Sequence, residues 1–275
     1  MNSPGNLTVL VRDPGCGKYL RSSGNCAVLR EPDVQVAEHA LNIIVLVAAS
    51  ALSEVAEFVQ TANRRHQLKA LLVHADIGER WIGTLLDRAQ LRTLSMLLVH
   101  QGTDHGRRIV EAWRAGAQHQ LIADAVALPD RLLVIGCDLK RLEVPFNALP
   151  ALKKLSAAGR AAFELDPDGS FLFWPGADVH LDLDSLRYAA DPAFRAQAQA
   201  EGLRSHARLG QAIAELRSQL NLSASDIPGV SERQLRRVEK GQSLPRSTTL
   251  AKLAKAHNLT LPAYLDLLAP IVRGE

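Results

Sequence analysis

Between Leu7 and Val126 the sequence alternates short apolar runs with amphipathic stretches, and this pattern restricts the fold more than any other feature. The runs are LTVLV, IIVLVA, ALLVHAD, SMLLVH and HQLIAD. The stretches SEVAEFVQTANRRH, RWIGTLLDRAQL and GRRIVEAWRAGA between the later runs repeat apolar residues near a 3.6-residue period. Strands that alternate with such helices predict a parallel sheet with helices on both faces. We therefore expect an α/β domain over residues 1–126.

The chain length indicates more than one domain. A chain of 275 residues favours two or three domains, each with its own core. The apolar runs are well short of the roughly 20 residues that span a bilayer, so we expect no membrane partner. Three cysteines without a repeated spacing, and no signal-peptide pattern, favour a cytoplasmic protein without disulfides.

The segment LSMLLVHQGTDHGRRIVEAWRAGAQHQLIADAV resembles the second half of a response-regulator receiver domain, in which strand, helix, Ala-Gly-Ala and strand follow in order. The resemblance covers about residues 42–126. A receiver needs an acidic pair for Mg²⁺, an Asp that accepts phosphate and a Lys after its last strand. VLVAAS contains no acid, and LIADAV contains no lysine. Asp76 stands two positions away from the place of the phosphate-accepting Asp. We expect a pseudo-receiver or other Rossmann-like domain without phosphotransfer.

Residues 127–202 have a different pattern, with strand-like segments around the helix-like ALPALKKLSAAG. Asp166-Pro167-Asp168-Gly169 is a hairpin turn signal, and we predict a small α+β domain. The run Trp174-Pro175-Gly176-Ala177-Asp178 resembles a bacterial domain family of unknown function that is marked by Trp-Pro-x-Gly-Ala-Asp and is sometimes joined to a helix-turn-helix. This resemblance implies an architecture but no activity.

Positive charge is concentrated toward the end of the chain. Residues 203–258 contain ten Lys/Arg and four Asp/Glu, a net charge of +6. Residues 1–202 contain 21 Lys/Arg and 23 Asp/Glu, a net charge of −2. A basic module on a nearly neutral body indicates a polyanionic partner, and nucleic acid is the first candidate.

The basic region contains the pattern of a helical domain. RLGQAIAELRSQL repeats leucine and isoleucine along one helical stripe, and Ser223 can cap a short second helix that contains Ile227. Pro228-Gly229 ends that helix. Ser231 then caps a third helix, in which Gln234 completes a capping box and after which Gly241 supplies the stop.

Val230 before the cap, with Leu235 and Val238 within the third helix, forms the inward face, and the basic residues point elsewhere. The following PRSTTLAKLAKAHNLTLPAYLDLLA predicts two more helices. Five short helices over residues 203–269, of which the third is the most basic, resemble the phage repressor and Cro-like (XRE-type) helix-turn-helix domain. This all-α domain would complete a multi-domain chain.

The repressor resemblance implies roles for individual residues. Arg217 and Glu239 correspond to a structural ion pair between the first and third helices. Bases in the major groove would be contacted by Arg233, Gln234 and Arg236, and by Glu232 unless its carboxylate only favours the helix N-terminus. Phosphates would be contacted by Ser223, Ser225, Ser231, Arg237, Lys240, Arg246, Ser247 and Thr248.

The second helix departs from the family pattern. Five residues, Ala224 to Pro228, stand where the family usually has eight, so about one helical turn is missing. Our hypothesis is that Ile227 and the turn alone set the angle of the third helix.

We predict a dimeric, DNA-binding transcriptional regulator that binds a near-palindromic operator, with residues 1–202 for sensing, dimerisation or docking of a small-molecule or protein effector. The alternative is an antitoxin or anti-regulator whose front domains bind a protein partner. An enzyme is not expected, because no catalytic constellation stands out, and no cofactor is expected. Asp178, His180, Asp182 and Asp184 alternate along one segment, which favours an exposed polar strand face over a metal site.

Overall fold

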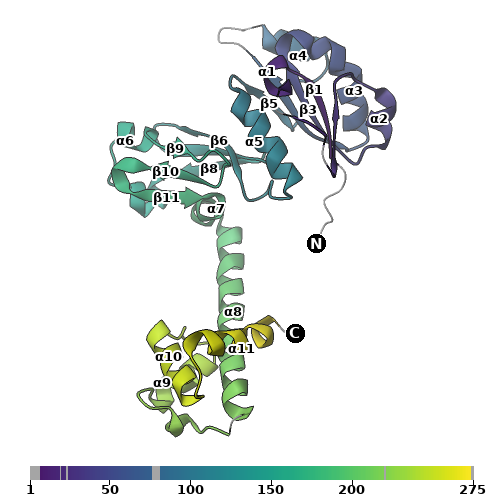
Figure 1. The fold of residues 1–275 in the computed structure, drawn as a ribbon. Helices are drawn as coiled ribbons and strands as arrows, with labels where there is room; N and C mark the ends of the chain where they lie inside the picture. Colours follow the sequence, from purple (N-terminus) through teal and green to yellow (C-terminus); the bar gives the residue numbers. More distant parts are fainter. Residues whose placement is uncertain (1–6, 19, 23, 76–80, 220, 274–275) are drawn as a thin grey trace. The chain divides into compact units, whose positions relative to one another are not determined.

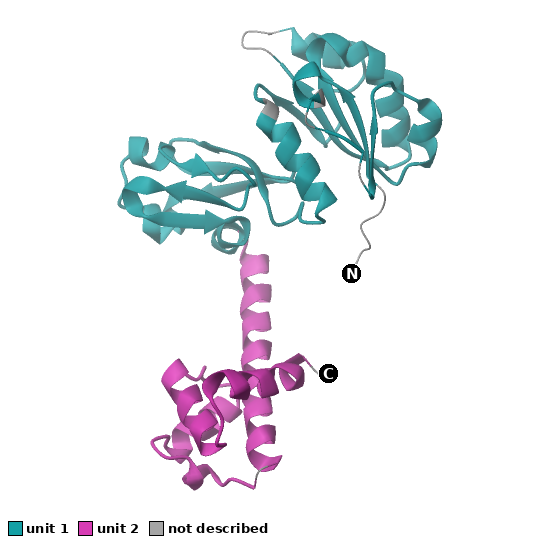
Figure 2. Ribbon diagram, viewed as in Figure 1, with its two compact units in different colours: residues 1–190 teal, residues 191–275 magenta. Residues whose placement is uncertain are grey.

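The structure, a computed structural model, describes residues 7–18, 20–22, 24–75, 81–219 and 221–273. The chain divides into two compact units, Met1–Ala190 (unit 1) and Asp191–Glu275 (unit 2), shown in Figure 2. Asp76 lies outside the described residues. Cys16, Cys26 and Cys137 are buried thiols. Within the described part of the chain, no helix is both long enough and apolar enough to cross a membrane.

Unit 1 begins with a five-stranded parallel sheet of order β2-β1-β3-β4-β5 (Figure 1). Its strands are β1 (Leu7–Arg12), β2 (Cys26–Leu29), β3 (Asn42–Ala48), β4 (Leu68–His74) and β5 (Leu97–His100). The connecting helices are α1 (Pro14–Gly17), α2 (Val34–His39), η1 (Ala49–Ala51), α3 (Leu52–Arg64), α4 (Ile82–Arg88) and α5 (Thr103–Arg114). The expected parallel α/β sheet is confirmed.

Alternate residues of the central strand enter two separate cores, because successive side chains in a strand point to opposite faces. Ile43, Val45 and Val47 pack with buried residues of α2, α3 and α4. Ile44 and Leu46 pack with buried residues of α1 and α5. The near-continuous apolar run of β3 therefore reflects a strand that is covered on both faces.

Two details of the predicted sheet are wrong. HQLIAD was expected to supply a strand of the parallel sheet, but β6 (Ile122–Ala127) pairs antiparallel with β7 (Arg131–Gly136). The short turn at residues 128–130 explains this, since a parallel partner would require a crossover connection. The edge strand β2 was missed, because its four residues carry no alternation that separates a strand from a loop.

The rest of unit 1 contains two three-stranded antiparallel sheets, of order β6-β7-β8 and β11-β10-β9, together with short helices, which agrees with the expected small α+β region. The remaining elements are β8 (Arg141–Pro145), η2 (Phe146–Ala148), η3 (Pro150–Leu152), α6 (Ala157–Ala161), β9 (Glu164–Leu165), β10 (Phe171–Trp174), η4 (Pro175–Ala177), β11 (Val179–Asp182) and α7 (Leu183–Ala190). They share a core that includes the fully buried Trp174. The expected boundary between residues 126 and 127 falls inside β6.

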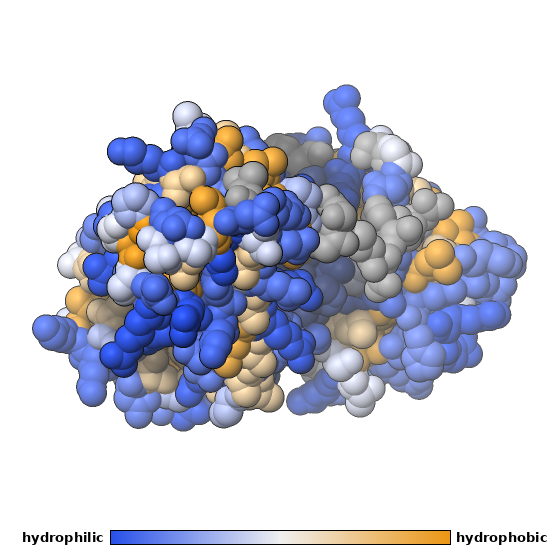
Figure 3. All heavy atoms as spheres, turned by 90° about the horizontal axis from the view of Figure 1, so that it is seen from below, coloured by the Kyte–Doolittle hydropathy of each residue, from blue (hydrophilic) through white to orange (hydrophobic). Residues whose placement is uncertain are grey.

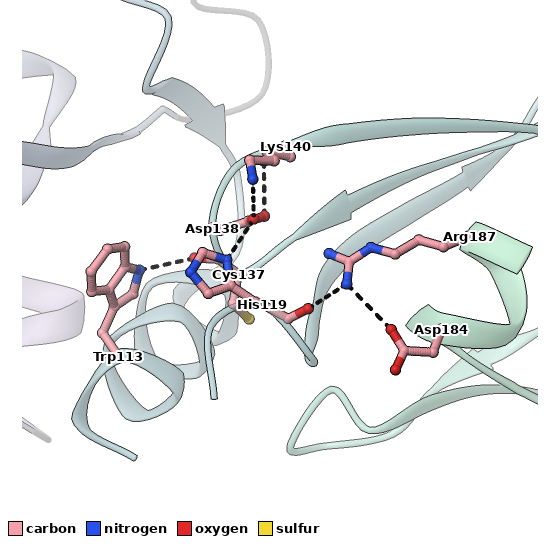
Figure 4. A network of polar contacts seen from close by, with 7 residues as sticks. All are labelled: Trp113, His119, Cys137, Asp138, Lys140, Asp184 and Arg187. Carbon is pink, nitrogen blue, oxygen red and sulfur yellow. Dashed lines mark hydrogen bonds and ion pairs between the residues drawn. The ribbon is translucent and has the colours of Figure 1, made fainter. Parts of the chain in front are cut away.

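Polar contacts join the parallel and antiparallel parts of unit 1 (Figure 4). Trp113 of α5 donates its indole N–H to the Cys137 carbonyl at 3.0 Å. His119 Nδ1 lies 3.0 Å from the buried carboxylate of Asp138, and Arg187 of α7 donates to the His119 carbonyl at 2.6 Å. The Trp113 contact fixes the end of α5 against the antiparallel region, and the other two contacts fix the segment between α5 and β6 to the same region.

Unit 2 consists of α8 (Pro192–Gln219), η5 (Ala224–Asp226), α9 (Glu232–Glu239), α10 (Ser247–Ala256) and α11 (Leu261–Arg273). A single 3₁₀ turn, η5, stands where the second helix was expected. The expected boundary between residues 202 and 203 falls inside the continuous helix α8. Ile213, Leu235, Leu253 and Tyr264 belong to one buried core.

On the face of the molecule drawn in Figure 3, hydrophobic residues form small, separate areas among hydrophilic ones.

Candidate nucleic-acid interface

The helix α9 has a capped start, a buried face and a defined end. Ser231 Oγ accepts a hydrogen bond from the Gln234 backbone N–H at 3.2 Å, which satisfies one of the open donors of the first turn. Leu235 and Val238 are 0% and 2% exposed and pack into the core of unit 2. Gly241, with φ of +67°, ends the helix in the left-handed conformation that favours glycine.

The opposite face of α9 is exposed and positively charged; we call it the basic face. It consists of Glu232, Arg233, Arg236, Arg237 and Lys240, which with Gln242 line a shallow cavity of about 390 Å³. These helix positions follow i, i+1, i+4, i+5 and i+8, so they lie opposite the buried residues. Its one acid is paired, because Arg236 Nη2 lies 3.3 Å from Glu232 Oε2. Four cationic side chains and one anionic side chain give this face a net positive charge.

Gln234 lies at the flank of the basic face and interacts with α10. Its Nε2 donates to Thr249 Oγ1 at 3.3 Å, and Gln234 is not among the cavity-lining residues. The predicted reciprocal half of the capping box is therefore wrong, since the Gln234 side chain reaches Thr249 rather than the Ser231 backbone. The contact of Gln234 with a base stays a prediction.

An ion pair joins α8 to the end of α9. Arg217 Nε lies 2.6 Å from Glu239 Oε1, and Nη2 lies 3.2 Å from Oε2. Arg217 also donates to the Leu222 carbonyl at 2.6 Å. The hydrogen bond with Glu239 outweighs the opposing effect of burial and raises the pKa of Arg217. The guanidinium therefore joins three segments of unit 2, and Glu239 is held away from the basic face.

The short segment before α9 ends in a tight turn. Ile227 is 2% exposed, and the Val230 N–H donates to the Ile227 carbonyl at 3.3 Å across Pro228-Gly229. Gly229 has φ of +76°, as the third position of a type II turn requires. At the start of the segment, the Ser223 N–H donates to Asp226 Oδ2 at 2.6 Å.

The residues predicted to contact phosphates lie at the starts of η5, α9 and α10 and on the basic face. Ser223 and Ser225 are exposed, with their hydroxyl oxygens 2.6 Å apart. Arg246, Ser247 and Thr248 are exposed at the start of α10, where no side chain of the described residues caps the helix. Open backbone N–H groups at such a helix start suit an anionic oxygen.

Two residues of α10 that contact the α9 region were not singled out from the sequence. Thr249 accepts from Gln234, and Lys252 Nζ donates to the Gly229 carbonyl at 2.8 Å. The hypothesis that Ile227 and the turn alone set the angle of α9 is therefore incomplete. No spacing rule within one helix could have identified these contacts, because they depend on how α10 packs.

A second polar cluster lies at the carboxyl edge of the parallel sheet, the edge where doubly wound sheets bind ligands. His74 Nδ1 lies 3.2 Å from Asp13 Oδ2, and His105 Nε2 lies 3.3 Å from Asp124 Oδ2. His100 lies between the other two rings, at centroid distances of 5.5 and 5.6 Å. We call these five residues the histidine chain.

The histidine chain contains rings with opposite pKa shifts. The hydrogen bond that His105 donates to the Asp124 carboxylate outweighs burial and raises the pKa of His105, whereas burial lowers the pKa of His100. Among the described residues, no group of three or more His, Cys, Asp or Glu could hold a metal ion. The alternation of Asp178, His180, Asp182 and Asp184 ends early, because α7 begins at Leu183 and Asp184 lies in that helix.

The His105–Asp124 pair predicts a specific pH dependence of stability. A raised folded pKa means that the contribution of His105 is complete below its ordinary value of 6.5 and is lost as pH rises through the folded value. The free energy of unfolding of unit 1 should therefore fall over this range in the wild type but not in His105→Gln. Urea unfolding of the full chain, followed by Trp fluorescence, measures this because Trp81, Trp113 and Trp174 all lie in unit 1.

The exposed His39 provides the matched control. His39→Gln should keep the pH dependence of the wild type. The same pH dependence of the free energy of unfolding in wild type and His105→Gln would contradict a stabilising role of the His105–Asp124 pair.

Comparisons with known proteins agree with this division of the chain. Residues 213–263 match the helix-turn-helix family, and residues 122–192 match a family described as protein of unknown function (DUF2442). Comparison with curated proteins and with solved structures gives no match. The first match supports a DNA-binding regulator of the XRE type, and the second agrees with the expected middle domain of unknown function.

Proposed function

We propose that the protein is a sequence-specific transcriptional regulator that binds double-stranded DNA as a homodimer and recognises a near-palindromic operator through α9. The observation that carries the proposal is the basic face of a helix whose opposite face is buried and whose end is held by Arg217–Glu239. In this class of domain the recognition helix enters the major groove, and dimers contact two half-sites about one helical turn apart.

The contacts follow from the position of each side chain on α9 and α10. Arg233 and Arg236 contact base edges, where a guanidinium can bind guanine bidentately, and Glu232 lies in the same turn. Gln234 contacts a base from the flank of the basic face. Phosphates are bound by Arg237 and Lys240, with the remaining contacts from Ser223, Ser225, Ser231, Arg246, Ser247 and Thr248.

Unit 1 serves in sensing, dimerisation or docking of a small-molecule or protein effector, and the protein acts in the cytoplasm, where the DNA lies. The support is architectural: unit 1 has its own cores on both sides of the parallel sheet and a third in the antiparallel region. The proposal includes no catalytic step.

Arg233→Ala should lower affinity for the operator by roughly ten- to a hundredfold, because one bidentate base contact is lost. Footprinting of the native upstream region identifies the operator, and gel shifts then compare the variants. Arg204→Ala is the matched control, since it removes the same charge from an exposed position on α8.

Two results would contradict the proposal. One is the absence of any protected sequence, and the other is an equal loss of affinity in Arg233→Ala and Arg204→Ala. Co-purification of a stoichiometric protein partner without DNA binding would instead support the antitoxin or anti-regulator alternative.

A further inference from the structure

The segment before α9 is too short to hold the recognition helix in the usual way. In a helix-turn-helix the helix before the turn packs against the recognition helix. Here that element is the single 3₁₀ turn η5, and the large apolar side chain that this segment buries is that of Ile227, directly after the turn. The turn that follows is exposed at Pro228 and Gly229. Another element must therefore restrain the start of α9 if it is to have one orientation.

Helix α10 makes the first of two such contacts through Lys252. Its ammonium group donates to the Gly229 carbonyl at 2.8 Å. Its side chain also covers the turn, since a Cβ atom added at Gly229 would lie 3.2 to 3.5 Å from Lys252 Nζ, Cε and Cδ. A charge-assisted hydrogen bond is roughly twice as strong as a neutral one. Lys252 therefore holds the turn directly before Ser231, the cap of α9.

The second contact comes from Thr249, one helical turn before Lys252. Thr249 is 5% exposed, so its hydroxyl is held in place by the surrounding core. It accepts the hydrogen bond from Gln234 Nε2 at 3.3 Å. Gln234 belongs to the first turn of α9, so this contact and that of Lys252 lie on either side of the helix start.

We propose that Lys252 and Thr249 are positioning residues, through which α10 sets the orientation of the recognition helix in place of the missing turn. This inference rests on the proposed function for its DNA-binding consequence. Because α10 also presents Arg246, Ser247 and Thr248 at its start, the same helix would relate the basic face to the phosphate backbone. Gln234 would approach its base with an amide already oriented by Thr249.

The test compares Lys252→Met and Lys255→Met in the full chain, with operator DNA and an unrelated duplex at several salt concentrations. Lys255 is the matched control, as an exposed lysine on the same helix. We expect Lys252→Met to lower operator affinity by about tenfold, with affinity for the unrelated duplex close to that of Lys255→Met. A lysine that only contacts phosphate would weaken binding to both duplexes alike and reduce the salt slope by about one.

Thr249 is tested by two substitutions. Thr249→Val removes the acceptor and keeps the shape, and it should relax base preference at the position closest to Gln234. Thr249→Ser keeps a hydroxyl and should restore that preference. Equal preferences in the three proteins would overturn the role of Thr249.

A measurement without DNA separates this inference from the proposed function. Amide hydrogen exchange of residues 230–235 in the free protein should be faster in Lys252→Met than in Lys255→Met, while exchange in the core of α8 stays the same. Faster exchange supports the positioning role even if no operator is found, a result that would refute only the proposed function. Two results would overturn the positioning role of Lys252. One is that Lys252→Met changes neither the exchange of residues 230–235 nor the operator affinity. The other is that exchange is unchanged and Lys252→Met weakens binding to both duplexes alike, as expected for a lysine that only contacts phosphate.

Discussion

Replacing Gly210 by alanine should destabilise unit 2 by about 2 kcal/mol, although the same change at an open helical position is stabilising by about 1 kcal/mol. A Cβ atom at Gly210 would lie 2.3 Å from the Val238 carbonyl oxygen and 2.7 Å from that of Glu239. Both atoms belong to the backbone of α9, so α8 and α9 would have to separate. Such overpacking costs about 3 kcal/mol, which exceeds the gain in helix propensity.

Gly202 on the same helix is the matched control. Apart from Gly202, its two chain neighbours and the nearby backbone of α8, no atom of the described residues lies within 4 Å of a Cβ added there, so Gly202→Ala should stabilise α8 by up to about 1 kcal/mol. Helical circular dichroism during urea unfolding of the full chain measures both effects. The urea midpoint followed by Trp fluorescence should be the same in both variants as in the wild type, because the three tryptophans lie in unit 1 and report its unfolding. Equal stabilities of the two variants would contradict the close contact of α8 with α9.

Glu239→Ala should destabilise unit 2 by about 2–3 kcal/mol, because it leaves the guanidinium of Arg217 partly buried without its carboxylate partner. The Arg217 and Glu239 side chains are 20% and 13% exposed, so water compensates only in part. The double variant Arg217→Met/Glu239→Leu should recover most of the loss, since two apolar side chains then replace two charges. A double-mutant cycle, measured by urea unfolding, isolates the energy of the pair.

Glu232→Ala is the control for this prediction. It breaks the Arg236–Glu232 pair, whose side chains are 68% and 55% exposed, and should change stability little. A loss as large as that of Glu239→Ala would show that burial does not distinguish the two pairs. Stability unaffected by Glu239→Ala would remove the Arg217–Glu239 pair as a support of α9.

Much of the fold could be predicted because its signals are local. The apolar run of β3 and the spacing of Val55, Phe58, Val59 and Ala62 in α3 indicate a covered strand and an amphipathic helix without knowledge of any partner. The cap at Ser231 and the stop at Gly241 define α9 in the same way. Residues predicted to contact DNA, such as Arg233 and Arg236, lie on its basic face because helical period alone separates them from Leu235.

Which segments of the chain pack against each other could not be predicted in the same way. The run that became β6 had the composition of a buried strand, but only its pairing with β7 decided which sheet it joined. The contact of Gln234 with Thr249 spans 15 residues, and that of Lys252 with Gly229 spans 23. The histidine chain joins residues that are still farther apart in the sequence, from Asp13 directly after β1 to Asp124 in β6.

The sequence by itself determined most elements of this protein, apart from the edge strand β2 and the 3₁₀ turn η5: which segments form strands or helices, which face of each is apolar, and which helix has a basic face. Hydrophobic period, caps and stops determine these features within a few residues of the chain. Only the tertiary structure decided which helix contacts the start of α9, where the Gln234 side chain lies and which histidines lie next to one another. These outcomes depend on packing between segments that are distant in sequence, and no local spacing specifies them.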